Sequence, residues 1–404
     1  MALTTYGKRP QSAADYISLS NSILAQFCRE NPDIVIFGAR GMGAVIQNAL
    51  GFFDVSVSCF CDNSPPDSGE FNGTLCLKPS EAVQQYPNAV YIFSAIEPAT
   101  CDIMKEQLTA IMPDMHYCFW DVIYYAYATT LRNVDKNVFA EALWCFWKQR
   151  KSEDVKIHSL SLRITSRCTL RCKECCFLVP YQPIQRDFPL DELIVPMEHL
   201  CQITDGVLDL TINGGETFLY ADLGKLIKKL ACMSNIIGIV IVTNGTVLPT
   251  NDIIKLCAEN AIRVRISNYE VYSSKSLELY DKCRMFGVSV SEYQHADKWC
   301  ALGITRNYRT DEENKAIADN CPPAGGKRRR ALGLYNSGVH ICDRYDGLAA
   351  CGYIDDELNA DLHFDVMTGS KTDLKEFLSG GFQYRLCDMC NWPMVEIQPG
   401  EQLD

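Results

Sequence analysis

Residues 167–176 of the chain read RCTLRCKECC. Within them Cys168, Cys172 and Cys175 stand at a CxxxCxxC spacing, so one short loop carries three thiols. Thiolates are the usual ligands of iron–sulfur clusters, and three of them leave the fourth iron of a four-iron cluster open. Zinc sites differ, because they use four protein ligands arranged as separated pairs. The stretch therefore predicts a four-iron cluster with one open coordination position.

Two predicted strands flank this motif. Residues 157–165 alternate apolar and polar side chains, as a strand does, and lead into the cysteine loop. Residues 209–216 read DLTINGGE, a second strand that ends in Gly214, Gly215 and Glu216. Glycines permit close backbone approach, and a carboxylate accepts hydrogen bonds from a cationic amine. This segment therefore suits an aminoacyl ligand, with a plain strand-end turn as the alternative.

With these two segments the chain resembles the radical S-adenosylmethionine (radical SAM) superfamily, whose signature is CxxxCxxC after the first strand of a partial (β/α) barrel. The resemblance implies that Cys168, Cys172 and Cys175 ligate a four-iron cluster that binds S-adenosylmethionine (SAM) at its open iron. Glu174 departs from the family pattern, in which an aromatic residue usually precedes the third cysteine. The alternative is an accidental group of cysteines in a chain that has 21 of them.

The resemblance also implies which residues contact SAM. The methionine amino group would meet the glycine–glycine–glutamate segment, and the ribose and carboxylate would meet polar residues that end the next two strands. Ordinary polar strand caps are the alternative for the residues of those two strands. The predicted cofactor-binding residues are Gly214, Gly215, Glu216, Asn244, Ser267 and Asn268.

Strand and helix patterns alternate between residues 155 and 305. Further strands are predicted at 236–242 and 263–266, and helices at 223–233, 251–259 and 275–286. Such alternation indicates a parallel sheet with right-handed crossovers. Polar residues at the carboxyl ends of the strands then fall on the face where barrel enzymes bind their ligands. The expected fold is α/β, with a partial (β/α)6 TIM-type barrel at its centre.

Residues 1–125 are predicted to form a separate Rossmann-like α/β domain. A strand at 33–37 precedes the glycine turn 38–43 and a helix, and further strands are expected at 54–60 and 89–94. This order is that of a mononucleotide-binding half, with Asp62 placed to meet a ribose. The GxxGxG spacing differs from the usual GxGxxG, so a docking role is as plausible as nucleotide-sugar binding.

Residues 126–154 are expected to be a helical linker. The segment from Tyr117 to Lys151 is rich in aromatic residues. Aromatic rows at helical spacing usually pack, so we expect helices that join the first domain to the barrel. A substrate-binding aromatic platform is the alternative.

Residues 306–404 hold a second group of cysteines. Cys321 is followed by a hairpin at 332–341 that ends at Cys342, and then by the CxxC pair Cys387 and Cys390. Structural zinc fits this ligand number. The order resembles the auxiliary-cluster (twitch, SPASM-like) extension of some radical SAM enzymes, which implies a second four-iron cluster. Cys351 is a spare cysteine that could replace one of the four.

Composition excludes several classes of protein. The net charge of −12 disfavours a nucleic-acid binder. No apolar run is long enough to span a membrane, and Met1–Ser20 lacks the pattern of a secretory signal. We therefore expect a cytoplasmic protein, whose many cysteines stay reduced instead of forming disulfides.

The predicted activity is cleavage of SAM to a 5′-deoxyadenosyl radical that abstracts hydrogen from a substrate. A sugar, aminocyclitol or nucleotide-sugar is favoured, with oxidation of an alcohol to a ketone as the outcome. Epimerisation, in which Cys300 or Cys351 returns a hydrogen atom, is the first alternative. A peptide-modifying enzyme and a non-catalytic electron carrier are the others. The expected partner is an external one-electron donor, a flavodoxin or a ferredoxin; the general base is unknown.

Overall fold

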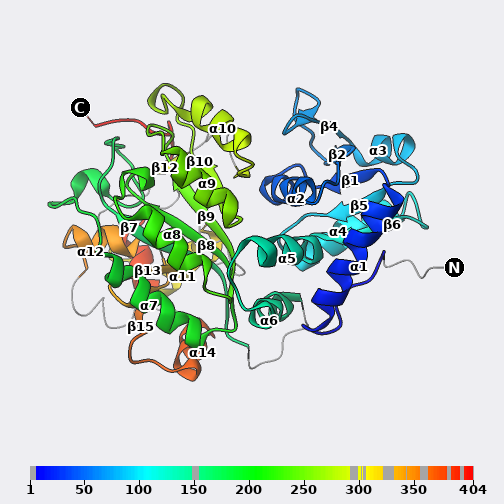
Figure 1. Cartoon of the computed structure of the whole chain (residues 1–404). Coiled ribbons are helices and arrows are strands. Elements are labelled where there is room, and N and C mark those ends of the chain that lie inside the picture. Colours follow the sequence, from blue (N-terminus) through cyan, green and yellow to red (C-terminus); the bar gives the residue numbers. More distant parts are fainter. Residues whose placement is uncertain are drawn as a thin grey trace.

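The structure is a computed structural model that describes residues 6–147, 154–291, 299–301, 303, 306–321, 332–342, 344–354, 363–379, 384–391 and 395–403. Two α/β units lie side by side in this part of the chain, each built on its own sheet (Figure 1). No helix within the described ranges is long and apolar enough to cross a membrane.

The N-terminal sheet has the strand order β3-β4-β2-β1-β5-β6. All neighbours pair in parallel except β3, which pairs with β4 in the antiparallel sense. Without β3, the strands follow the 3-2-1-4-5 order of a Rossmann sheet, as the sequence predicts. The strands are β1 (Ile34–Phe37), β2 (Cys59–Cys61), β3 (Glu70–Phe71), β4 (Thr74–Leu77), β5 (Val90–Phe93) and β6 (His116–Phe119).

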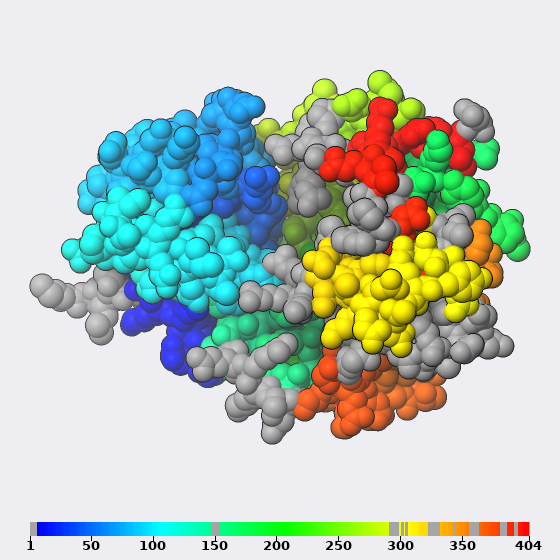
Figure 2. All heavy atoms as spheres, turned by 180° about the vertical axis from the view of Figure 1, so that it is seen from behind, coloured from blue at the N-terminus to red at the C-terminus, as the bar shows by residue number. Residues whose placement is uncertain are grey.

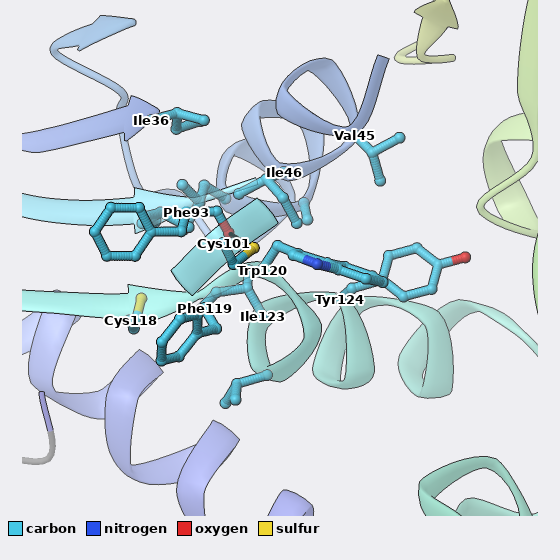
Figure 3. Packing of buried hydrophobic residues seen from close by; sticks show 14 of the residues in the cluster. Ile36, Val45, Ile46, Phe93, Cys101, Cys118, Phe119, Trp120, Ile123 and Tyr124 are labelled. Atoms are coloured by element: carbon cyan, nitrogen blue, oxygen red, sulfur yellow. Dashed lines mark hydrogen bonds between the residues drawn. The ribbon is translucent and has the colours of Figure 1, made fainter. Parts of the chain in front are cut away.

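Helices cover both faces of this sheet, so its central strands β1 and β5 are buried along their whole length. Aromatic and aliphatic side chains from the sheet and from α2 and α5 form one dense core (Figure 3). The helices are α1 (Asp15–Glu30), α2 (Gly41–Phe52), α3 (Pro79–Gln85), α4 (Pro98–Thr109), α5 (Trp120–Leu131) and α6 (Lys136–Trp147).

One predicted strand of this unit is shorter than expected. The sequence predicts a strand from residue 54, whereas β2 begins only at Cys59. Asp54 has a positive φ of 59°, and the Val55 amide donates to the carbonyl of Leu50. These residues therefore close the end of α2 before the chain can enter the sheet.

The aromatic helices α5 and α6 belong to the core of the N-terminal unit. Trp120, Tyr124 and Phe139 are buried there, and the same cluster includes Leu208 and Ile237 of the barrel. A linker was expected to begin at residue 126, but the segment from there to Trp147 belongs to the first unit. It also joins the two units through a shared core.

Buried hydrogen bonds fix this junction. The guanidinium of Arg132 donates to the carbonyl oxygens of Ala231, Met233, Ile236 and Ile237. An arginine with these carbonyl partners leaves few of its donors unsatisfied, which makes its burial tolerable. These hydrogen bonds therefore hold the N-terminal unit against the barrel.

The barrel sheet has the order β11-β10-β9-β8-β7-β13-β14-β15. Strands β7 to β11 run parallel, and the helices that connect them cover one side of the sheet (Figure 1). The strands are β7 (Lys156–Thr165), β8 (Gly206–Gly214), β9 (Ile236–Thr243), β10 (Arg263–Ile266) and β11 (Val290–Ser291). The connecting helices are α7 (Leu190–Ile203), α8 (Leu223–Ala231), α9 (Asn251–Glu259) and α10 (Ser276–Met285).

The sixth parallel strand of this sheet comes from an unexpected place. β13 (Leu332–Tyr335) pairs in parallel with β7, Leu334 opposite Leu162. The antiparallel strands β14 (Gly338–His340) and β15 (His363–Asp365) extend the edge beyond it. The predicted hairpin at 332–341 is therefore present, but it extends the barrel sheet instead of standing in a separate domain.

The rest of the described C-terminal part lies against the barrel. It contains α11 (Asp311–Asn320), α12 (Tyr345–Ala350), α14 (Lys371–Ser379) and the short 3-10 helix η5 (Tyr384–Met389). β12 (Trp299–Ala301) and β16 (Val395–Ile397) pair as a small antiparallel ribbon. Figure 2 shows these segments, coloured yellow to red, gathered over one face of the barrel unit.

Candidate functional site

The cysteine loop leaves the carboxyl end of β7 and holds its three thiols close together. Burial is the main cause that raises the pKa of Cys168 to about 12; the Leu170 amide opposes the rise, and the charges of Cys175 and Cys172 contribute to it. Burial likewise raises the pKa of Cys172 to about 11, with a contribution from Cys175. Each thiol thus lies within electrostatic reach of the others. The structure brings together the three cysteines that the sequence singles out.

Hydrogen-bond donors point at the sulfur atoms of this loop. The Leu170 amide lies 3.4 Å from Cys168 Sγ, and Asn244 Nδ2 lies 3.5 Å from the same atom. Gln402 Nε2 lies 3.4 Å from Cys172 Sγ. Donors of this kind stabilise a thiolate more than a thiol. The donors from Leu170 and Gln402 therefore partly offset the effect of burial, which favours the neutral thiol.

The third cysteine lies in a similar environment. Burial raises the pKa of Cys175, and the backbone amides of Val179, Phe177 and Leu178 oppose this effect. In the described ranges, no three His, Cys, Asp or Glu side chains are gathered tightly enough for a single metal ion. Ligation of an iron–sulfur cluster by these thiols stays a prediction. That cluster would be held by Cys168, Cys172 and Cys175.

Gly214 and Gly215 pack against the cysteine loop itself. A Cβ on Gly214 would lie 2.3 Å from the carbonyl oxygen of Thr165, and one on Gly215 would lie 2.1 Å from that of Arg167. The amides of Gly215 and Glu216 donate to these same two carbonyls, at 2.9 and 2.8 Å. The glycines are therefore needed so that the end of β8 can hold the start of the loop. Sequence reasoning expected them to make room for a ligand.

Glu216 is fully buried and ties β8 to β9. Its Oε1 accepts from the Phe218 amide and from Thr243 Oγ1, at 3.0 and 2.8 Å, and its Oε2 accepts from the Asn244 amide at 2.9 Å. The structure thus gives this carboxylate a structural role between two strands. Acceptance from the SAM amino group stays a prediction.

The other predicted SAM contacts lie at the carboxyl ends of β9 and β10. Asn244 bridges the cysteine loop, since its Nδ2 also lies 3.3 Å from Thr169 Oγ1. Asn268 is largely buried, and its Oδ1 accepts from the Glu270 amide at 3.1 Å. Ser267 contributes backbone bonds, its amide donating to the carbonyl of Thr243. Asn244 thus lies beside the thiols, whereas Asn268 and Ser267 stabilise the turn after β10; their contact with SAM stays a prediction.

Arg163 is a site residue that sequence reasoning missed. It is 1% exposed, and in the described structure none of its three guanidinium nitrogens has a hydrogen-bond partner. Since Leu162 and Ile164 face the helices, Arg163 faces the inside of the barrel, where the rings of Phe177 and Phe188 flank it. Its charge opposes the rise in the pKa of Cys175 that burial causes. The signal available in the sequence was an arginine between the apolar residues Leu162 and Ile164 of a predicted strand.

The second group of cysteines is also brought together in part. Burial is the main cause that raises the pKa of Cys387 to about 12, and the charges of Cys390 and Cys321 contribute to the rise. Arg344 Nη1 donates to Cys390 Sγ at 3.0 Å. Cys342 packs against the small cluster that contains Leu386 and Met389, the neighbours of Cys387. This arrangement fits a second thiolate-bound cluster on Cys321, Cys342, Cys387 and Cys390, which stays a prediction.

Cys351 lies within electrostatic reach of Cys175 of the first group and packs against the same small cluster as Cys342 of the second. Burial raises the pKa of Cys351. The charge of Arg163 opposes this rise, and the charge of Cys175 adds to it. The helix that precedes Cys351, α12, approaches the cysteine loop so closely that a Cβ on Gly347 would lie 2.4 Å from the carbonyl oxygen of Phe177. Cys300 lies on β12, opposite Glu396 of β16.

The glycine turn of the N-terminal unit is tightly closed. A Cβ on Gly43 would lie 2.1 Å from the carbonyl oxygen of Gly38. Both carboxylate oxygens of Asp62 accept backbone amides, from Ala39 and Ser64, at 2.9 Å. Asp62 therefore holds this turn, and ribose binding by it stays a prediction.

Replacing Gly215 with alanine is expected to destabilise the protein by about 2 kcal/mol or more, because the new Cβ would overlap the carbonyl oxygen of Arg167. The matched control is Gly51→Ala in α2, where no atom lies within 4 Å. That change should stabilise the helix by about 0.5–1 kcal/mol. Urea unfolding of both variants measures the difference. Equal stabilities would contradict the role assigned to Gly215.

Glu216 should make the stability of the metal-free protein depend on pH. Burial raises its pKa from 4.5 to about 7, so folding favours the protonated form. The stabilisation is then present below the pKa of Glu216 in the unfolded chain, and it is lost as the pH rises through the pKa of Glu216 in the folded protein. Its full size is about 3 kcal/mol. We expect wild-type unfolding free energy to fall over this window and Glu216→Gln to flatten the profile; parallel profiles would contradict the assignment.

The comparisons with known proteins show partial similarity to one group of enzymes. The chain is 34% identical to a GTP 3′,8-cyclase of Campylobacter jejuni subsp. doylei over 97 residues, which are 24% of this chain and 30% of the cyclase. It is 36% identical to a GTP 3′,8-cyclase of Staphylococcus saprophyticus over 99 residues, 23% and 28% of the two chains. The chain thus spans less than a third of the length of these curated relatives. No protein-family profile matches it.

Solved structures resemble the chain weakly. The structure of BtrN in complex with AdoMet and 2-DOIA matches 62% of this chain and 98% of its own, at 14% identity and a TM-score of 0.37. SuiB of Streptococcus suis bound to S-adenosylmethionine matches 34% of this chain and 33% of its own, at 17% identity and a TM-score of 0.29. These TM-scores are too low to establish a shared fold. The sequence similarity to the cyclases is thus confined to about a quarter of this chain.

Proposed function

We propose that this chain is a radical SAM enzyme that oxidises an alcohol of a sugar, aminocyclitol or nucleotide-sugar to a ketone. The observation that carries the proposal is the cysteine loop at the carboxyl end of β7. Its thiols are gathered there, and Asn244 from the end of β9 donates to one of them. Ligands bind at this end of the strands in (β/α) barrels. The loop and the strand ends therefore lie where a barrel enzyme would bind this cofactor.

Each residue of the loop has a distinct task in this proposal. Cys168, Cys172 and Cys175 would hold three irons of a four-iron cluster, which when bound supplies the electron for cleaving SAM to a 5′-deoxyadenosyl radical. Gly214 and Gly215 position the start of the loop, and Glu216 aligns β8 with β9. Arg163 brings a buried positive charge near the Cys175 thiolate. An external flavodoxin or ferredoxin would deliver the electron.

The oxidation needs an acceptor for the second electron of the substrate. The substrate carbon loses a hydrogen atom to the 5′-deoxyadenosyl radical, the hydroxyl loses a proton to a base, and one electron must leave. A second cluster on Cys321, Cys342, Cys387 and Cys390 would accept it, because four thiolates occupy every iron and leave none for substrate. The grouping of Cys321, Cys387 and Cys390 supports this role.

The inner face of the barrel supports a polar substrate. Asn213 and Arg163 are register partners on neighbouring strands, and Asn213 donates to Ser161. Within the described structure Asn213 Oδ1 is buried without a hydrogen-bond partner. Buried polar atoms without partners are costly, so a ligand rich in hydroxyl groups would relieve them. This supports the sugar or aminocyclitol class.

Replacing Cys168, Cys172 and Cys175 together with alanine should abolish release of 5′-deoxyadenosine from SAM. The measurement is chromatography of anaerobic reactions with a chemical reductant, which need no substrate. Cys176→Ala is the matched control, because Cys176 is exposed beside the triplet and has no ligand role here. It should keep the activity. Undiminished 5′-deoxyadenosine from the triple variant would refute the proposal.

Epimerisation of a sugar is the second candidate function, and the place of Cys351 favours it. This thiol lies within electrostatic reach of Cys175 and Arg163. This thiol would return a hydrogen atom to the substrate radical from the opposite face, and the thiyl radical left behind would take one electron from the external donor and one proton from solvent. The substrate then loses no net electrons, and the second cluster would have no substrate electron to accept.

Reactions in deuterated water separate the two functions, with an aminocyclitol and UDP-glucose as probe substrates. Oxidation gives a product that lacks two hydrogens and carries no deuterium on carbon, which is the expected result. Cys351→Ala should then leave turnover unchanged. Deuterium at one carbon by mass spectrometry, lost in Cys351→Ala, would establish epimerisation instead.

A further inference from the structure

The last described residues of the chain cross the cysteine loop. We call residues 400–403 the tail segment. The Lys173 amide donates to the carbonyl of Glu401 at 2.7 Å, and the Leu403 amide donates to the carbonyl of Arg171 at 2.8 Å. Cys172 and Gln402 therefore form an antiparallel β-bridge, although they lie 230 residues apart. A backbone bridge of this kind fixes the position of the cysteine between its two neighbours.

The side chain of Gln402 adds two further contacts to the bridge. Its Oε1 accepts from the Arg171 amide at 2.6 Å, and its Nε2 donates to Cys172 Sγ at 3.4 Å. One amide group thus holds both the backbone before the cysteine and the sulfur itself. Glutamine suits this position because its head group accepts and donates at once.

The tail segment is held in place on its own side. A Cβ on Gly400 would lie 2.7 Å from Cβ of Tyr269, so the tail passes directly against the residue that follows Asn268. Tyr269 contacts Trp299 edge to face, with ring centroids 5.0 Å apart. Trp299 lies on β12, which pairs with β16 just before the tail. The backbone of the tail is therefore also held by Tyr269 and β16, while Gln402 Nε2 donates to the Gly400 carbonyl within it. Figure 2 shows the tail, in red, on the face of the barrel unit.

We propose that Gln402 is a positioning residue for the first cluster: it holds the cysteine loop and donates a hydrogen bond to the sulfur of Cys172. The inference rests on the proposed function, since it takes Cys172 to be an iron ligand. Hydrogen bonds to ligating sulfurs raise the reduction potential of an iron–sulfur cluster, because they stabilise the more negative reduced state. Gln402 therefore makes the cluster easier to reduce and slower to lose iron.

The test variant is Gln402→Met, which keeps the volume of the side chain but has no N–H donor and no carbonyl acceptor. Because the methionine side chain still covers Cys172, little water is added near its sulfur, and the effect of water on the reduction potential stays small. We expect a lower midpoint potential for the cluster whose electron paramagnetic resonance (EPR) signal responds to SAM. We also expect iron to pass to a chelator about tenfold faster, as for other residues that support metal ligands.

A measurement on the metal-free protein tests the contact itself. Amide hydrogen exchange should be faster at Arg171 in Gln402→Met, since that amide loses its acceptor. Exchange at Lys173 should be unchanged, because it donates to the backbone of Glu401. Leu403→Pro removes the other backbone donor of the bridge and should speed exchange at Lys173 as well.

Glu401→Gln is the matched control. It removes the charge that pairs with Lys173 at 3.1 Å but keeps the backbone bridge, and both partners are largely exposed. The midpoint potential and iron release should equal those of the wild type. If the wild type binds no iron, the proposed function fails while the exchange data still test the bridge. If iron binds and Gln402→Met matches the wild type in potential and iron release, the role of Gln402 is refuted.

Discussion

The contact between the backbone of Gly215 and the carbonyl of Arg167 decides how this end of the barrel is built. At that point two chain segments approach so closely that any side chain would overlap the carbonyl. The cysteine loop can start where it does only because β8 ends in two glycines. Once the loop is fixed there, Asn244 from β9 reaches its first cysteine. Hydrogen bonds to Glu216 keep β8 and β9 in the required register.

The C-terminal part of the chain then covers the same loop from the other side. Gly347 brings α12 against Phe177, and Gln402 brings the tail segment against Cys172. Leu178 packs into the small core that surrounds Cys342. The two groups of cysteines are thus joined by packed side chains instead of a flexible linker.

The parts of this fold that depend on local pattern could be predicted from the sequence. The alternation of residues 157–165 predicts a strand, which the structure has as β7 at Lys156–Thr165. The apolar run at 236–242 predicts a further strand, which corresponds to β9. The cysteine triplet was visible because its spacing lies within one loop. Strand order in the N-terminal sheet also follows the expected Rossmann pattern. Hydrophobic period and turn chemistry are local signals, which explains this success.

Contacts between distant segments could not be predicted in the same way. β13 pairs with the free parallel edge of β7, and no local sequence signal indicates which strand will pair there. Gly215 and Asp62 contact backbone of distant segments, which no local signal indicates, and ligand binding by them stays a prediction. Gln402 lies in a polar segment without a motif, and only the fold brings it to Cys172. The strand predicted from Asp54 begins only at Cys59, because Asp54 and Val55 close the end of α2.

The central claim is that Cys168, Cys172 and Cys175 hold a redox-active cluster with one open iron. Iron and sulfide analysis of the anaerobically reconstituted wild type, followed by EPR of the reduced protein with and without SAM, tests it most directly. The account predicts about eight irons and eight sulfides per chain and a signal that changes when SAM is added. Stoichiometric zinc without iron, or an iron–sulfur signal that SAM leaves unchanged, would contradict it.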